Sequence, residues 1–282
     1  METMEVEELL KQYAAGERNF KGITLEGMDL TGANLSDANF TRANLRNVIL
    51  KDANLSGVNF REVNLGDAYL SGTNLSEANL IGASLVKANL TNVNLTGANL
   101  RGSNSREANL TEANLSQANF AEANLSQANL TKANLSEATM IRVNLIRSIL
   151  SYSNLEFANL TNALMNESIL HAANLTNVSL SGAMLSGSNL SEANLSKSTT
   201  IGATLSEANL SGAKLRTTNA SWTTLRGANL TRANLFRAKL SWSNLTGAIL
   251  IKAVLIDAKL NQTNLRNADM SGAIMPDGKT FP

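Results

Sequence analysis

The stretch from Ala108 to Leu135 repeats one five-residue phrase six times without interruption, ANL-TE-ANL-SQ-ANF-AE-ANL-SQ-ANL-TK-ANL. The large apolar residue of each phrase, here called the centre, falls on a multiple of five. The same register runs from Phe20 to Met275, which gives 52 centres, of which 49 are Leu, Phe or Met. A fixed period over nearly the whole chain indicates a repeat architecture and not a set of separate domains.

A five-residue period fits neither regular secondary structure. Five helical residues turn about 500°, so successive centres would be spread around the helix. In a flat strand, where side chains alternate between faces, successive centres would lie on opposite faces because five is odd. We therefore expect a short extended segment followed by a two-residue corner. The extended segment turns inward both the centre and the small residue two positions before it.

The glycines support these corners. Of the 18 glycines, 15 lie two residues after a centre, where the third residue of a type II turn needs a positive φ. Only one β-branched residue, Thr217, occupies this second corner position, which disfavours such side chains. Pro276 lies at a first corner position, where turns favour proline. Spacing and turn chemistry therefore predict the same backbone.

Composition excludes several classes of protein. The 282 residues include no cysteine, so disulfides and thiolate chemistry are absent. With 24 basic and 23 acidic residues the net charge is +1, which predicts no field for nucleic acid or an anionic membrane. There is no long apolar run, and the acidic N-terminus differs from a secretory signal. We therefore expect a cytoplasmic protein.

The repeated phrase, a small residue, then Asn or Asp, then Leu or Phe and two variable residues, resembles the pentapeptide-repeat family over about residues 18–277. The resemblance implies an all-β solenoid, the right-handed quadrilateral β-helix, in which four pentapeptides make one 20-residue coil. About 13 coils would then extend about 60 Å at the usual strand spacing. The opening segment, with Leu9, Leu10, Tyr13 and Gly16, resembles the leader of cyanobacterial members, in which a short helix covers the first coil.

The two ends of the chain interrupt the repeat. Apolar residues at helical spacing predict a helix over residues 3–15, with Thr3 as N-cap and Gly16 as the stop. At the other end Met270, Met275 and Phe281 are expected to be exposed or lightly covered by the tail. The predicted organisation is a capping helix at 1–17, a β-helix at 18–277 and a tail at 278–282.

No residue pattern predicts chemistry. His171, the single histidine, falls at an outward corner position without a cysteine, and general acid–base catalysis needs a cleft and a partner. The Asn that precedes 31 of the 52 centres is interpreted as support for the turns. We therefore expect no enzyme activity, no catalytic or metal site and no cofactor.

Breaks in the phrase are more informative. Trp222 and Trp242 lie twenty residues apart at outward corner positions, on the side where Thr200 and Ala220 replace large centres. One interpretation is that the tryptophans stack and cover a thin core. The other is an interaction hot spot, where Trp is enriched.

A second set of breaks replaces the recurrent Asn, or a neighbouring polar residue, with an apolar side chain. These side chains suit a flat strand face, or they form an apolar stripe for a partner. The candidate partner-binding residues of this set are Ile149, Tyr152, Ile169, Ile249 and Ile251.

The functional prediction is a rigid, non-catalytic interaction rod with an unknown protein partner, which we expect to be monomeric and to bind neither nucleic acid nor membrane. One alternative, implied by the resemblance, is a DNA mimic that binds type II topoisomerases (gyrase). A 60 Å mimic needs about 35 negative charges, whereas this chain carries 23 acids and a net charge of +1, and its short tail lacks the dimerisation element of those members. A structural rod without a specific partner is the other alternative.

Overall fold

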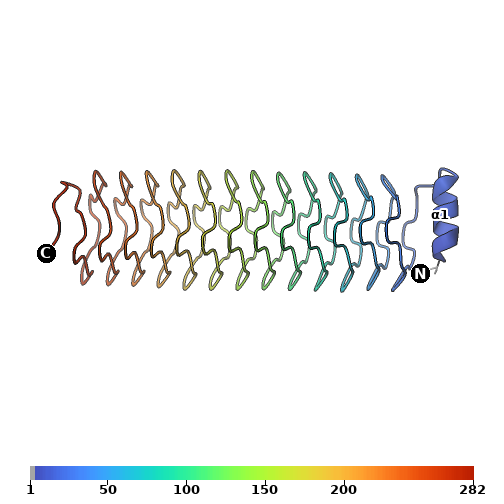
Figure 1. Cartoon of the computed structure of the whole chain (residues 1–282), viewed down its shortest axis with the longest axis horizontal. Helices are drawn as coiled ribbons and strands as arrows, with labels where there is room; N and C mark the ends of the chain where they lie inside the picture. Colours follow the sequence, from blue (N-terminus) through green and yellow to red (C-terminus); the bar gives the residue numbers. More distant parts are fainter. Residues whose placement is uncertain (1–3) are drawn as a thin grey trace. The chain divides into compact units, whose positions relative to one another are not determined.

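A computed structural model describes residues 4–282. Its contacts divide the chain into two compact units, Met1–Thr139 and Met140–Pro282, which are described separately. The N-terminal unit contains one helix, α1 (Val6–Ala14), followed by coils, and the C-terminal unit consists of coils and a short tail (Figure 1).

Each coil contains twenty residues and four sides. Single parallel β-bridges join residue i to residue i+20, as between Asn59 and Asn79 in the N-terminal unit and between Asn174 and Asn194 in the C-terminal unit. A turn interrupts the chain at every fifth residue. Four pentapeptides therefore close one square coil, and no strand is longer than a single bridge, because every side ends at a corner after three residues.

The repeat from Val58 to Glu62 shows how each backbone N–H finds an acceptor. Val58 N–H bonds to the Leu55 carbonyl across the turn at 3.2 Å, and Asn59 N–H bonds to the preceding coil, at the Ala38 carbonyl. The N–H groups of Phe60 and Glu62 bond to the following coil. The fifth, from Arg61, bonds to the side-chain oxygen of Asn59 at 3.2 Å. All five donors are satisfied, as a backbone this close to the core requires.

The recurrent Asn therefore has a structural role. Its Oδ1 accepts the N–H two residues along the chain, which is an Asx turn. Its Nδ2 also bonds between coils, as from Asn79 to Asn59 Oδ1 at 3.3 Å and from Asn174 to Asn154 Oδ1 at 2.9 Å. These bonds confirm that the Asn column supports the turns.

The corners adopt the predicted turn. In the part of the chain from Gly22 to Gly272, every second corner position has a positive φ, between 54° and 71°. The next N–H closes the turn on the centre carbonyl, as from Ala43 to Phe40 at 3.0 Å. Even Thr217 adopts φ 57° there. A non-glycine residue is strained in this conformation, and the bond from its N–H to the next coil offsets part of that strain.

The core consists of the centres and the small residues two before them, which are buried without exception from residue 35 to residue 258. The centres of the last coil, Leu260, Leu265, Met270 and Met275, are half-buried. Phe20 stacks on Phe40 with ring centroids 5.4 Å apart, and Phe40 lies 5.6 Å from Phe60. These three phenylalanines therefore form one column in the core of the first coils. Ser105 is buried in place of a leucine, and its hydroxyl has no hydrogen-bond partner in the described residues.

Helix α1 is shorter than the predicted range of 3–15. It begins at Val6 after Glu5, an extended residue whose side chain makes no capping bond. The predicted N-cap, Thr3, lies outside the described residues. At the other end Gly16 is the predicted stop, with φ 100°. Its N–H bonds to the Tyr13 carbonyl, and Glu17 N–H bonds to the Gln12 carbonyl, a Schellman motif.

The C-terminal tail folds back on the last repeat. Thr280 forms an antiparallel bridge with Ile274, and Phe281 N–H bonds to the Ala273 carbonyl at 2.7 Å. The final turn differs from the others, because the positive φ lies at Gly278, not at the residue after Pro276. Phe281 remains 37% exposed, so the tail satisfies backbone groups at this end but covers it lightly.

Candidate functional site

The corners of the C-terminal unit order its candidate residues. In the coil that follows Ala220, the chain passes corners at Ser221–Trp222, Arg226–Gly227, Thr231–Arg232 and Phe236–Arg237. We call these the first, second, third and fourth corners, and residues twenty apart lie at the same corner of adjacent coils. The first and third corners are diagonally opposite, as are the second and fourth.

Trp222 and Trp242 occupy the first corner and stack on each other. Their ring centroids are 5.0 Å apart and their planes differ by 3°. The two residues are 60% and 53% exposed. The thin core beneath them is closed by two threonines, since Thr223 Oγ1 donates to the Thr200 carbonyl at 2.5 Å and lies 3.2 Å from the Thr200 hydroxyl. The stack is thus a surface feature.

The apolar candidates lie along the third corner and separate into two groups. Ile149 pairs with Ile169 in the adjacent coil, and Tyr152 packs edge-on against His171 with centroids 5.4 Å apart. Ile249 and Ile251 lie further along. Between the groups the column continues with Asn, at positions 189, 209 and 229. The structure therefore divides the predicted stripe, and places both parts diagonally opposite the tryptophans.

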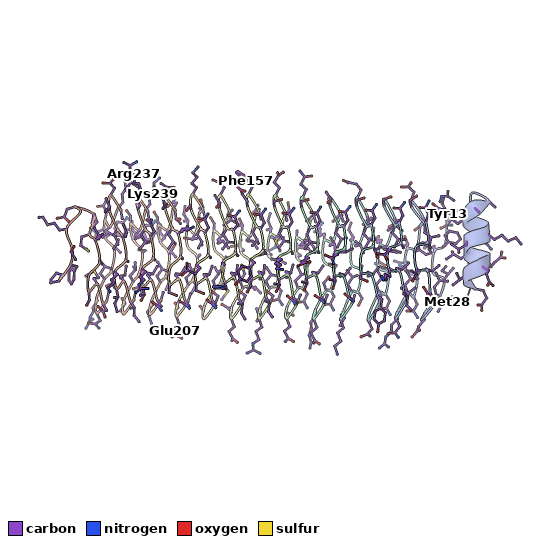
Figure 2. The ribbon with its side chains drawn as sticks, viewed as in Figure 1. Tyr13, Met28, Phe157, Glu207, Arg237 and Lys239 are labelled. Atoms are coloured by element: carbon purple, nitrogen blue, oxygen red, sulfur yellow. The ribbon has the colours of Figure 1, made fainter. Side chains whose placement is uncertain are left out.

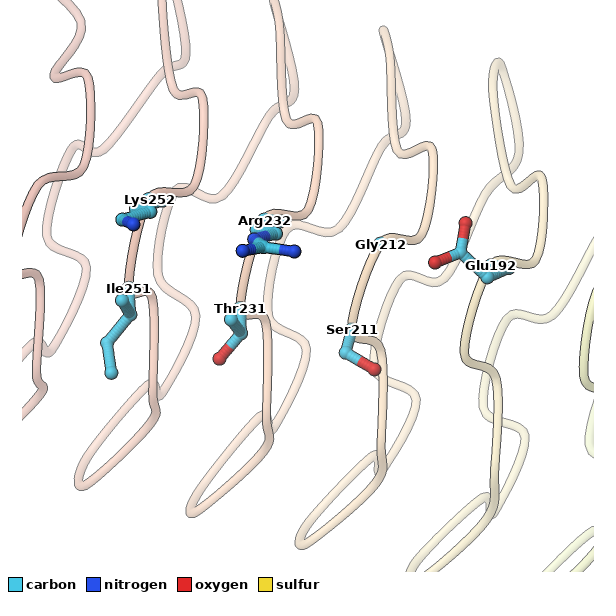
Figure 3. Close-up of a pocket in the computed structure, with 7 residues that line it drawn as sticks. All are labelled: Glu192, Ser211, Gly212, Thr231, Arg232, Ile251 and Lys252. Atoms are coloured by element: carbon cyan, nitrogen blue, oxygen red, sulfur yellow. The ribbon is translucent and has the colours of Figure 1, made fainter.

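A shallow pocket opens at the third corner beside Ile251 (Figure 3). Its volume is about 300 Å³. It forms where Gly212 has no side chain, and the Glu192 carboxylate occupies part of the space that a Cβ would fill. Arg232 extends towards Gly212 from the other side. The pocket thus has a carboxylate at one end and cations, Arg232 and Lys252, at the other.

The lining of this pocket contains no histidine or cysteine. Its hydroxyl groups, Ser211 and Thr231, share it with the Glu192 carboxylate. His171 lies in other coils at the same corner, with Nδ1 2.9 Å from the hydroxyl oxygen of Ser191. Within residues 4–282 no cluster of three His, Cys, Asp or Glu side chains could hold a metal ion. None of the described helices is long and apolar enough to cross a membrane.

Ion pairs between adjacent coils dominate the surface electrostatics. Arg147 Nε lies 2.8 Å from Glu167 Oε2, and this hydrogen bond, followed by the charge of Arg147, lowers the pKa of Glu167. Hydrogen bonds from Arg42 and Arg61 likewise lower the pKa of Glu62. All of these side chains are exposed, and such pairs contribute little to stability.

The structure also reveals a charge asymmetry that the net charge of +1 conceals. The N-terminal unit has 11 basic and 16 acidic residues, a net charge of −5, whereas the C-terminal unit has 13 basic and seven acidic residues, a net charge of +6. At the fourth corner of the C-terminal unit, the guanidinium groups of Arg216 and Arg237 each lie 4.8 Å from the Phe236 ring. This cluster was not predicted from the sequence, although a charge count for each half of the chain would have indicated it.

Corners with turns every five residues and bridges every twenty define the class of protein as a quadrilateral β-solenoid. The family model for pentapeptide repeats matches eight overlapping or adjacent segments, which run from residue 19 to residue 272. The chain therefore belongs to the pentapeptide-repeat family, whose fold is the right-handed quadrilateral β-helix. A search of curated proteins finds no match.

Solved structures that align with this chain include proteins from cyanobacteria. HetL from Nostoc sp. strain PCC 7120, a pentapeptide repeat protein involved in the regulation of heterocyst differentiation, is 33% identical and aligns over 99% of this chain and 100% of its own, with a TM-score of 0.35. Rfr23 from Cyanothece 51142 is 33% identical over 41% of this chain and 92% of its own, with a TM-score of 0.39. QnrB1, a plasmid-mediated fluoroquinolone resistance protein, is 13% identical over 88% of this chain and 90% of its own, with a TM-score of 0.28.

Proposed function

We propose that this protein is a non-catalytic interaction scaffold of the pentapeptide-repeat family, which presents the stacked pair Trp222 and Trp242 to a protein partner. The stack is the observation that carries the proposal. Both residues are more than half exposed and adopt left-handed φ values of 61° and 64°, where a bulky side chain is strained. Exposed Trp in such numbers is more typical of interfaces than of free surfaces.

The fold supports a scaffold role. Within each unit, backbone bonds tie each coil to its neighbour, as in the repeat Val58–Glu62, so the surface side chains of a unit hold fixed positions. We propose that α1 caps the first coil, because Leu9 is fully buried and Tyr13 Oη donates to the Ser36 carbonyl at 3.0 Å. At four pentapeptides to a coil, the 52 centres correspond to 13 coils. We take the molecule to act as a cytoplasmic monomer.

A pull-down from the native cell tests the role of the tryptophans. The variant Trp222→Ala with Trp242→Ala is expected to lose a protein that the wild type retains, while its far-ultraviolet circular dichroism is unchanged. Phe157→Ala is the matched control, because Phe157 is 59% exposed at the same kind of corner position. If the tryptophan variant and the wild type capture the same protein equally well, the proposed site is wrong. If the wild type captures no protein, a structural role without a partner is favoured.

The Ile and Tyr candidates are a second surface of the same proposed kind. Ile149, Ile169 and Tyr152 form one exposed group, and Ile249 with Ile251 forms another. The variant Tyr152→Ala in the same pull-down assigns or excludes the first group. Retention of the partner by this variant would leave the tryptophan corner as the site.

The topoisomerase alternative has less support. DNA mimicry requires a strongly negative surface, and the C-terminal unit has a net charge of +6. A gyrase supercoiling assay with the pure protein distinguishes the two, since the scaffold proposal predicts no inhibition at low micromolar concentration.

A further inference from the structure

One side of the C-terminal unit combines the exposed tryptophans with a group of cations. This side runs from the fourth corner to the first corner over three consecutive coils, and Asn219, Lys239 and Lys259 pair along its middle. Figure 2 shows Arg237 and Lys239 at one edge of the unit and Glu207 at the opposite edge. We call it the basic-aromatic face, and its residues are Arg216, Trp222, Phe236, Arg237, Lys239, Trp242 and Lys259.

The two lysines in the middle of this face weaken the fold where they stand. They occupy consecutive places in a column that is mostly Asn, where Asn would continue the ladder between coils. Bridged neighbours are about 4.8 Å apart, and like charges directly opposite each other destabilise a sheet. Neither Lys239 nor Lys259 forms an ion pair with any residue in the described range 4–282. Their pairing is therefore unexplained by folding alone.

The cations at the fourth corner are held in place by an aromatic ring. The guanidinium groups of Arg216 and Arg237 each lie over the Phe236 ring, 4.8 Å from its centroid. Arg237 is also paired with Asp257 at 3.1 Å, whereas Arg216 contacts no carboxylate among the described residues. Cation–π contact with Phe236 restricts Arg216, so less entropy is lost when it binds an anion.

One face of the tryptophan stack is open. The centroid separation of 5.0 Å matches the spacing of adjacent coils, so the rings stack along the coil axis. The free face of Trp222 is therefore directed towards the next corner in that direction, which is Gly202. Apart from its two chain neighbours, no residue has an atom within 4 Å of the position of a Cβ at Gly202, and Gly182 follows it at the same corner. Ile201 beside it is 39% exposed. The space can accept an apolar side chain from a partner.

We propose that the basic-aromatic face binds an acidic segment of a partner protein. The partner's carboxylates contact Lys239, Lys259 and Arg216, and one apolar or aromatic side chain packs on Trp222 above Gly202. This inference rests on the proposed function and specifies the chemistry of the partner. Trp and Arg are the residues that most often dominate protein interfaces, and the cations select a partner of opposite charge.

Two other anionic occupants fit the face less well. A single-stranded nucleic acid could stack only one base on this face, on the free face of Trp222, because the two tryptophan rings already stack on each other with centroids 5.0 Å apart and the Phe236 ring is covered by two guanidinium groups. A second copy of the chain would have to supply carboxylates from its acidic unit. Many of those are already paired within that unit, for example Glu62 with Arg42 and Arg61, and Glu107 with Lys87 and Arg106.

The chain offers a direct probe of this face. Trp222 and Trp242 are the only two tryptophans of the sequence. Fluorescence excited at a wavelength that tyrosine does not absorb therefore reports on the proposed site alone. The probes are a synthetic peptide of about 12 residues with Glu on both sides of a Phe-Phe pair, the same peptide with Lys in place of Glu, and an oligothymidylate of similar length. We expect a saturable change with the acidic peptide that weakens as salt is raised, and none with the basic peptide.

The decisive variant is Lys239→Asn with Lys259→Asn, which restores the common residue of the column and is expected to fold. It should weaken acidic-peptide binding about tenfold, which corresponds to two exposed ion pairs. The control, Arg226→Gln with Arg266→Gln, removes the same charge at the second corner and should bind as the wild type does. If the lysine variant and the arginine variant bind the acidic peptide equally well, the proposal is overturned. If the wild type binds the oligothymidylate more tightly than the acidic peptide, the partner is a nucleic acid and not a protein segment. If sedimentation shows salt-sensitive self-association that the lysine variant abolishes, the partner is a second copy of the chain.

The outcomes separate this inference from the proposed function. If the tryptophan variant loses the pull-down partner but the lysine variant keeps it, the scaffold function remains and the acidic character of the partner is wrong. If both variants lose the same partner, both proposals are supported. If neither variant loses the partner, the site itself is wrong.

Discussion

Replacement of Ser105 by Leu is expected to stabilise the N-terminal unit. Ser105 is the one centre of that unit that is not a large apolar residue, and it is buried with an unpartnered hydroxyl. The coil has not collapsed around it, since Ser105 N–H bonds to the Asn124 carbonyl at 2.7 Å, the same distance as from Leu85 N–H to Asn104. Room of leucine size is therefore expected at this position.

The magnitude follows from two contributions. Burying a leucine side chain stabilises by about 1.5–3 kcal/mol, and removing an unsatisfied buried hydroxyl adds about 1–3 kcal/mol. We expect a net gain of about 2–4 kcal/mol, because some of it is lost to imperfect fit. Urea unfolding, followed by circular dichroism, measures it as a shift in midpoint with an unchanged slope.

Three controls separate the contributions. Ser105→Ala removes the hydroxyl alone and should gain about 1 kcal/mol. Thr200→Leu should gain less than Ser105→Leu, since the Thr200 hydroxyl lies 3.2 Å from that of Thr223. Ser126→Leu, at a corner, should change stability by less than about 0.5 kcal/mol. A neutral or destabilising Ser105→Leu would show that Leu85 and Leu125 already fill the space, and would refute the argument from coil geometry.

The remaining predictions concern the Asn column, pH and α1. Asn59→Ala should lower the free energy of unfolding in urea by about 1 kcal/mol, because Arg61 N–H and Asn79 Nδ2 both lose the Asn59 oxygen as acceptor. An unchanged unfolding midpoint would mean that water replaces these hydrogen bonds without loss of stability. Hydrogen bonds from the Thr31 hydroxyl and then from its backbone N–H lower the pKa of Asp29 below its ordinary value of 3.8. Asp29 therefore stabilises the fold above about pH 4, and this contribution is lost as pH falls through the lower folded-state pKa. The thermal unfolding midpoint of Asp29→Asn should depend less on pH in that window than the midpoint of the wild type. Identical pH profiles for the two proteins would contradict this. Leu9→Ala should destabilise α1 and the first coil by about 2–4 kcal/mol, since Leu9 is fully buried. Hydrogen exchange should become faster in α1 and the first coil, whereas the control Leu10→Ala, at a more exposed site, should change it little. Unchanged exchange in Leu9→Ala would mean that α1 does not cap the coil.

Local chemistry made the repeat predictable. The position of the centres, the inward small residues and the positive φ two residues after each centre all follow from contacts within five residues. The structure confirms the positive φ from Gly22 to Gly272 and the burial from residue 35 to residue 258. Gly16 was identified as the helix stop for the same reason, because a left-handed C-terminal residue is a local requirement. The start of α1 was predicted too early, since the spacing of apolar residues does not fix where the first turn begins.

The candidate site depended on contacts between residues twenty or more apart. From the sequence, Trp222, Ile149 and Ile249 were equally distinctive, but closure of the four-sided coil places the tryptophans diagonally opposite the isoleucines. The same closure places Lys239 beside Lys259 and puts Gly202 at the corner of the coil adjacent to Trp222. The sequence by itself thus determined the backbone of each pentapeptide, whose turn is set by local φ preferences. Only the tertiary structure decided which side chains share a surface, because bonds between coils set that arrangement.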